Sequence, residues 1–197
     1  LGLAAWLAVG TILAVGRKAN WSRKGLAAQP ASTWGFAGAH IGLAIFAAGV
    51  TSMVVWADTD IGTLKSGDSL TLGSHTYTLE TVGGGQRDNY DYLAGQISVS
   101  KNGKPVTTLS TERRFYPVRN QITTEAGLHL SFGQTLFASI GKGEPTGGFV
   151  VQVYRHPFVV WIWLGALIMA LSGFISLGDR RLRLPKFSQV DKTGEMA

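Results

Sequence analysis

One titratable side chain, His40, stands inside the apolar segment WGFAGAHIGLAIFAAGV at residues 34–50. An imidazole in such a setting needs a partner, and an ionisable group inside a membrane span points to function. Small residues share its helical face: Ala37, Ala44 and Ala47. Three uses fit this face: a hydrogen bond across a helix interface, ligation of haem iron beside a flat helix surface, or proton relay.

The segment that holds His40 is predicted to cross a membrane. Residues 34–56 contain no Asp, Glu, Lys or Arg over 23 positions, enough to span the hydrocarbon layer as a helix. A second uncharged stretch of 21 residues covers 158–178, and residues 1–16 are typical of the end of a third span. We expect the chain to be the C-terminal part of a longer membrane protein, with transmembrane segments at 1–16, 34–57 and 158–178.

Basic residues cluster in the two short segments outside the spans, at 17–33 and 179–197, which together hold nine of the 18 basic residues. The positive-inside rule makes both segments cytoplasmic and puts residues 58–157 on the outward side, which for the inner membrane of a bacterium is the periplasm. The net charge of +6 then reflects topology, so nucleic acid is not an expected partner. The absence of cysteine excludes a disulfide scaffold or a thiolate metal site on this chain.

The residue pattern of 58–157 predicts an all-β domain, either an antiparallel sheet or a small barrel. β-branched, alternating segments separated by turn residues predict strands at 69–72, 75–82, 93–100, 105–112, 129–132 and 148–155. Asn102-Gly103 predicts a two-residue hairpin turn, and Gly83 to Gly85 a flexible turn. Trp56, Trp161 and Trp163 are expected at the outer interface, and Pro157 in the first turn of the last helix.

The other polar candidates carry weaker signals. His75 and His129 are expected to be ordinary surface or rim residues of strands. His156 would cap the following helix or contact a ligand or partner. Arg113 and Arg114 fit solvated charge at a sheet edge, or pairing with haem propionates or an acidic partner surface. The outward domain is therefore predicted to supply docking surface rather than reacting groups.

Four segments carry a resemblance to a known family: GAHIGLAIFAAGVTS at 38–52, TERRFYP at 111–117, TTEAG at 123–127 and the long segment YRHPFVVWIWLGALIMALSGFISLGDRR at 154–181. In this order they resemble the C-terminal third of CcmF, the large membrane subunit of the bacterial cytochrome c maturation haem lyase. The paralogous lyase for nitrite-reductase cytochromes is similar in the same places.

The resemblance implies a function and partners. Such a protein receives haem from the chaperone CcmE and, with CcmH and CcmI, attaches it to CXXCH cysteines of apocytochrome c. It also implies a b haem held in the membrane by two histidines, and the GAHIG position makes His40 resemble one of them. The second axial ligand and the Trp-Trp-Asp segment that handles substrate haem would belong to the missing N-terminal part.

Two other function classes stay open on the residues alone. A b-type cytochrome subunit moving electrons for another purpose would use His40 in the same way. A non-redox membrane scaffold with a periplasmic partner-binding domain would use it only for packing. If His40 does ligate haem, its other ring nitrogen needs a hydrogen-bond acceptor, which we expect from another helix because the carbonyls of its own helix are mostly occupied.

Overall fold

The computed structural model describes residues 1–179, and the predicted basic tail beyond Asp179 lies outside them. Its four α-helices are α1 (Gly2–Lys18), α2 (Arg23–Ala27), α3 (Ala31–Val55) and α4 (Val159–Leu177). α3 and α4 are long and apolar enough to cross a membrane, and most of their residues are not buried against protein. That exposure separates them from the core helix of a soluble protein.

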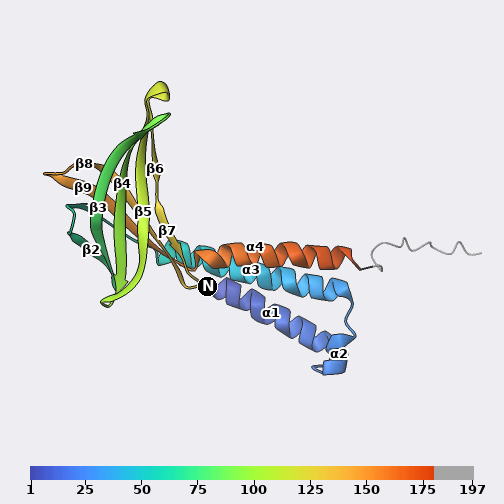
Figure 1. Cartoon of the computed structure of the whole chain (residues 1–197). Helices are drawn as coiled ribbons and strands as arrows, with labels where there is room; N and C mark the ends of the chain where they lie inside the picture. Colours follow the sequence, from blue (N-terminus) through green and yellow to red (C-terminus); the bar gives the residue numbers. More distant parts are fainter. Residues whose placement is uncertain (180–197) are drawn as a thin grey trace, which may run out of the picture. The chain divides into compact units, whose positions relative to one another are not determined.

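Nine strands follow α3 and precede α4 in the sequence: β1 (Asp58–Leu64), β2 (Ser69–Leu72), β3 (His75–Arg87), β4 (Tyr90–Lys101), β5 (Lys104–Tyr116), β6 (Gln121–Glu125), β7 (Gly127–Leu130), β8 (Gln134–Glu144) and β9 (Gly148–Pro157). Figure 1 shows them as a separate β domain. They form two antiparallel sheets, a four-stranded one in the order β1-β9-β8-β7 and a five-stranded one in the order β2-β3-β4-β5-β6. The predicted fold class, membrane helices with an inserted all-β domain, is confirmed, and the β domain is a two-sheet sandwich.

Alternating side chains build the sandwich core. Tyr77 and Leu79 on β3 and Ile97 on β4 face Leu136 and Val153 of the smaller sheet, all at 0% exposure. Burial of every second residue is what drives a strand pattern into a sheet with one apolar face. β1, β6 and β8 had not been predicted. β8 has this alternation, at Leu136, Ala138 and Ile140, and is flanked by Gly133 and by Pro145-Thr146-Gly147, so its signal was present in the sequence.

The hairpin turn predicted at Asn102-Gly103 is confirmed. Both residues have positive φ angles, 51° and 78°, and they connect Lys101 at the end of β4 to Lys104 at the start of β5. Asn and Gly tolerate this left-handed conformation, and the resulting backbone twist matches that of the two strands.

Two local predictions were wrong. Gly83 to Gly85 do not form a turn but continue β3, opposite Tyr92 to Ala94 of β4. A Cβ at Gly85 would lie 2.9 Å from the hydroxyl oxygen of Tyr92, so the strand needs glycine there for that ring to lie across it. Pro157 is the last residue of β9, paired with Gln134, because α4 begins only at Val159 after Phe158 with φ 57°.

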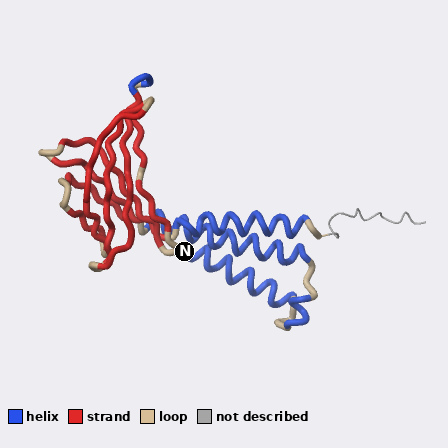
Figure 2. Tube along the Cα trace, viewed as in Figure 1, coloured by secondary structure: helices blue, strands red, loops and turns tan. Residues whose placement is uncertain are grey.

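Glycines line the face of α3 that packs on α4, and Figure 2 shows the two helices side by side. A Cβ added at Gly35, Gly38, Gly42 or Gly49 would lie between 2.2 and 3.0 Å from the nearest atom of Ser176, Ser172, Gly165 or Ile162, respectively. Small residues let helix backbones approach closely, and this dispersion-driven packing is how helices associate in lipid. Gly38 and Gly42, spaced four residues apart, are part of this seam.

Candidate functional site

His40 lies on the side of α3 away from the glycine seam. His40 is two residues from both Gly38 and Gly42, and two residues correspond to about 200° of rotation around the helix axis. Because the two glycines face α4, His40 faces away from it. The imidazole packs on Phe36, one turn earlier, with ring centroids 4.1 Å apart and planes inclined by 40°. The side chain is half-buried, which leaves part of the ring accessible at the helix surface.

A hydrogen bond fixes which nitrogen of His40 carries the proton. Nδ1 lies 2.9 Å from the carbonyl oxygen of Phe36, and a carbonyl oxygen can only accept, so Nδ1 donates. The neutral imidazole then has a free lone pair on Nε2, and within residues 1–179 that nitrogen has no hydrogen-bond partner. The expectation of an acceptor from another helix was wrong, because a helix carbonyl has a second lone pair that a histidine four residues later reaches.

The three alanines predicted beside His40 have different surroundings. Ala37 and Ala44 are 9% and 5% exposed, and Ala47 is half-buried. Ala37 lines an apolar cavity of about 290 Å³ between α1 and α3, together with Thr11, Val15 and Trp34 among others. Ala47 therefore leaves more open surface next to the histidine than Ala37 does.

A second cavity, of about 240 Å³, lies on the Phe36 side of His40. Ala14, Val15 and Lys18 of α1 and Ser32, Thr33 and Phe36 of α3 line it. The Lys18 ammonium donates to the hydroxyl of Thr33 at 2.7 Å, and the carboxylate of Asp179 accepts from the backbone N–H of Ser32 at 3.0 Å. These contacts satisfy polar groups at the N-terminus of α3, where four backbone donors have no partner in the helix.

The placement of His75 as a surface or rim residue was wrong. It is 1% exposed and lies between the two sheets, with Nε2 2.9 Å from the amide nitrogen of Gln134 on β8. The amide donates, so His75 Nε2 accepts. Burial, followed by the charges of Lys101 and Arg155, lowers the pKa of this imidazole below 6.5. Its alternation with Tyr77 and Leu79, both core residues, was the signal that would have placed it inside.

His129 also has the opposite orientation from the one its neighbours suggested. Leu128 and Leu130 are 59% and 65% exposed, while His129 is half-buried on the inner side of β7. Register explains this: His129 pairs with Leu136, a core residue, whereas Leu128 pairs with half-buried Phe137. The period of two determines which residues share a face, but not which face is buried.

Arg114 is held by neighbours on its own sheet. Its guanidinium donates from Nε to Glu112 at 2.9 Å, forms an ion pair with Glu125 at 3.5 Å, and lies 5.0 Å from the ring of Tyr90. The hydrogen bond to Glu112 raises the pKa of Arg114 above its ordinary value, so it is charged at any working pH. Arg113 points to the other face of the strand and is half-buried.

His156 lies in β9 and does not cap α4. Its ring stacks on Tyr154, with centroids 5.8 Å apart and planes inclined by 18°. Its Nδ1 is buried, and among the residues that the structure describes it has no hydrogen-bond partner. An unpaired buried ring nitrogen is costly, so a contact with a ligand or partner stays a candidate role for His156.

Comparison with known proteins decides the family. The model of the CcmF C-terminal β-sandwich matches residues 55–157. The chain is 37% identical over 182 residues to the cytochrome c-type biogenesis protein ccl1 of Rhodobacter capsulatus, covering 92% of this chain and 28% of the relative. The chain belongs to the CcmF family. CcmF of Pseudomonas aeruginosa is 36% identical over 154 residues, 78% of this chain and 23% of that protein.

A solved structure supports the fold of this CcmF-family chain. It carries the name cytochrome c haem lyase CcmF and matches with a TM-score of 0.69 at 18% identity, over 90% of this chain and 29% of its own. The chain thus spans about a quarter of the length of the family members it matches. The resemblance drawn from the four sequence segments is confirmed, and the relatives named above are described as cytochrome c-type biogenesis proteins.

Proposed function

We propose that this chain is the C-terminal part of a cytochrome c haem lyase subunit of a bacterial inner membrane. The whole protein takes haem from CcmE and, with CcmH and CcmI, attaches it to the CXXCH cysteines of apocytochrome c. A b haem in the membrane would reduce the haem iron. Family membership and the name of the solved relative support this proposal.

The observation that supports the proposed membrane haem is the tautomer of His40. Its Nδ1–H donates to Phe36, which orients the ring and leaves Nε2 free at the helix surface. A second-shell acceptor on one nitrogen, with the other nitrogen open, is the arrangement of an imidazole that ligates a metal. The residues present therefore fit an axial haem ligand. No cluster of three or more His, Cys, Asp or Glu within residues 1–179 suits another metal.

Each residue then has a defined task. His40 Nε2 would ligate the iron. The Phe36 carbonyl would orient the ring and hold the proton of the neutral tautomer on Nδ1, and Ala37, Ala44 and Ala47 would leave room for the macrocycle beside the helix. A bound b haem supplies single-electron transfer. The second axial ligand would come from the part of the protein outside this chain, since within residues 1–179 the other histidines all lie in the β domain.

We place residues 58–157 in the periplasm and the loop at 17–33 in the cytoplasm. Arg17, Lys18, Arg23 and Lys24 support this orientation through the positive-inside rule. The β domain would offer docking surface to a partner. Arg113 and His156 remain candidate contacts for a propionate or partner, whereas Arg114 would first have to leave Glu112.

Replacement of His40 by Ala tests whether this residue ligates a b haem. The variant should insert normally, because Ala is well tolerated in helices, yet lose the reduced b-type absorption of the purified full-length protein. Thr51→Ala is the matched control, since Thr51 also bonds a carbonyl four residues earlier on α3 but offers no ligand nitrogen. Ala44→Phe should also weaken the spectrum by crowding the macrocycle.

The same variants separate the candidate functions. Cytochrome c production in a deletion strain complemented with His40→Ala should fall with the spectrum if the subunit serves haem attachment. Loss of the spectrum with normal cytochrome c production would favour a b-type cytochrome for other electron transfer. A His40→Ala protein with normal abundance, a full spectrum and full maturation would make His40 a packing residue.

A further inference from the structure

The turn between β7 and β8 is bonded to the start of a membrane helix. The backbone N–H of Phe158, the residue before α4, donates to the carbonyl oxygen of Gly133 at 3.1 Å. Ser131 closes the same turn through its backbone N–H and its hydroxyl, both donating to the carbonyl of Gln134 at 2.9 and 2.7 Å. The turn therefore lies at the level where α4 enters the bilayer.

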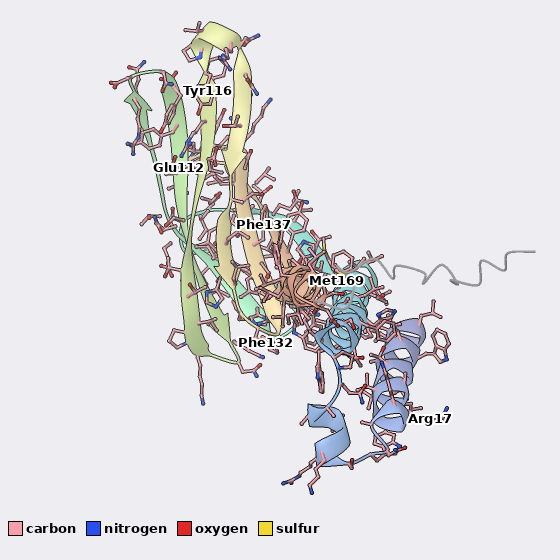
Figure 3. All side chains as sticks on the ribbon, turned by 90° about the vertical axis from the view of Figure 1, so that its right-hand side faces the viewer. Arg17, Glu112, Tyr116, Phe132, Phe137 and Met169 are labelled. Carbon is pink, nitrogen blue, oxygen red and sulfur yellow. The ribbon has the colours of Figure 1, made fainter. Side chains whose placement is uncertain are left out.

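Apolar side chains on this turn and its strand face outward. Phe132 is 64% exposed and its ring centroid lies 5.6 Å from that of Trp161, which in turn lies 4.8 Å from Phe158. Leu130, on the edge strand β7, is 65% exposed. Figure 3 labels Phe132 at one end of the sandwich, and Glu112 and Tyr116 near the other.

The exposed apolar residues of this turn lie in an uncharged stretch, part of which is the core strand β8. Residues 126–141, which include β7, the turn and most of β8, contain no Asp, Glu, Lys or Arg. This is the longest such stretch in the β domain. Exposed apolar residues in a segment without charges mark an interaction site rather than an ordinary solvated surface.

We propose that the β7–β8 turn is an interfacial membrane anchor, with Phe132 and Leu130 inserted among the lipids of the outer leaflet. Leu130 pairs with Thr135 at the end of the β7–β8 ladder, directly beside the turn, so it lies close to the level of Phe132. Aromatic side chains favour the interfacial layer, so Phe132 joins Trp161 and the exposed Trp163 in one belt.

The anchor gives the sandwich an attachment to the membrane in addition to the two helices that enter and leave it. A domain held only through flexible connections would be free to tilt, whereas a turn bonded to Phe158 and inserted in lipid restrains that motion. Lipid also covers the outward face of Leu130 on edge strand β7, where an exposed apolar edge would favour aggregation. This role is independent of haem ligation by His40.

Depth-dependent quenching tests the anchor. Cysteine would replace Leu130, Phe132 or Val118, one at a time, in a full-length protein without other cysteines, labelled with an environment-sensitive fluorophore and reconstituted in phosphatidylcholine and phosphatidylglycerol vesicles. Val118 is the control because it is 95% exposed in the turn between β5 and β6, next to Tyr116. Lipids brominated near the headgroup quench labels in the interface, and aqueous iodide quenches labels in water.

Labels at 130 and 132 should show blue-shifted emission and quenching by the brominated lipids, while the label at 118 responds to iodide alone. Iodide quenching at all three positions, without lipid quenching, would overturn the anchor. Protection of 130 and 132 from both quenchers would also overturn it, because protein would then cover the turn in place of lipid.

Discussion

His75 on β3 and Gln134 on β8 form a hydrogen bond between the two sheets of the sandwich, 2.9 Å from Nε2 to Nε2, at a site where His75 is 1% exposed. The geometry requires a neutral imidazole, since a protonated Nε2 could not accept from the amide. Residues 59 positions apart in the chain thus meet in a polar contact inside the core.

Replacing His75 with Ala should destabilise the β domain by about 2–3 kcal/mol, because it leaves a cavity and removes a partner of the Gln134 amide. The measurement is the thermal unfolding midpoint of the purified protein, followed by the β-sheet circular dichroism signal. His129→Ala, at a half-buried position, should shift the midpoint much less. Equal midpoints for the His75 variant and wild type would contradict the buried inter-sheet bond.

The stability of the β domain should depend on pH through His75. The folded state lowers the pKa of this imidazole below its ordinary 6.5, so the unfolded chain binds more protons as pH falls past that value. The stabilisation is complete above pH 6.5 and is lost as pH falls toward the folded pKa. Unfolding midpoints across this range should fall less steeply in a His75→Gln variant. Parallel curves would exclude His75 as the titrating group.

Adding a methyl group at Gly42 should separate α3 from α4. The new Cβ would lie 2.8 Å from the carbonyl oxygen of Gly165 and 2.9 Å from Cγ of Met169, so the helices must shift, at a cost of roughly 1–3 kcal/mol. Gly42→Ala should lower the amount of folded protein in the membrane. Gly173→Ala on α4 is the control, since nothing lies within 4 Å of its added Cβ and it should accumulate like wild type.

A topology reporter that works only in the periplasm should be active when it is inserted after Gly103, in the exposed turn between β4 and β5. A reporter that works only in the cytoplasm should be inactive there. The basic residues at 17–24 motivate this expectation through the positive-inside rule. A fusion after Ala28, which follows α2, should show the opposite activity. Cytoplasmic activity at Gly103 would reverse the orientation of the β domain.

The sequence by itself was sufficient for the membrane helices and for the class of the β domain. Length and lack of charge identify a span such as 34–56, and alternation with turn residues identifies strands such as 69–72, because both signals are local properties of the chain. The GAHIG segment likewise identified His40 as the residue to examine. Asn102-Gly103 predicted its turn because two positive φ angles restrict the residue choice so strongly.

Tertiary structure alone decided which face of each strand is buried and what each histidine contacts. His75 alternates with Tyr77 and Leu79, whereas His129 lies between two leucines, and the burial of each is set by the strands that it packs against. The proton on His40 follows from a carbonyl distance, which no residue pattern records. Period-two alternation is unchanged when its two faces are exchanged, so only the packing of one sheet on the other determines which side chains leave the solvent.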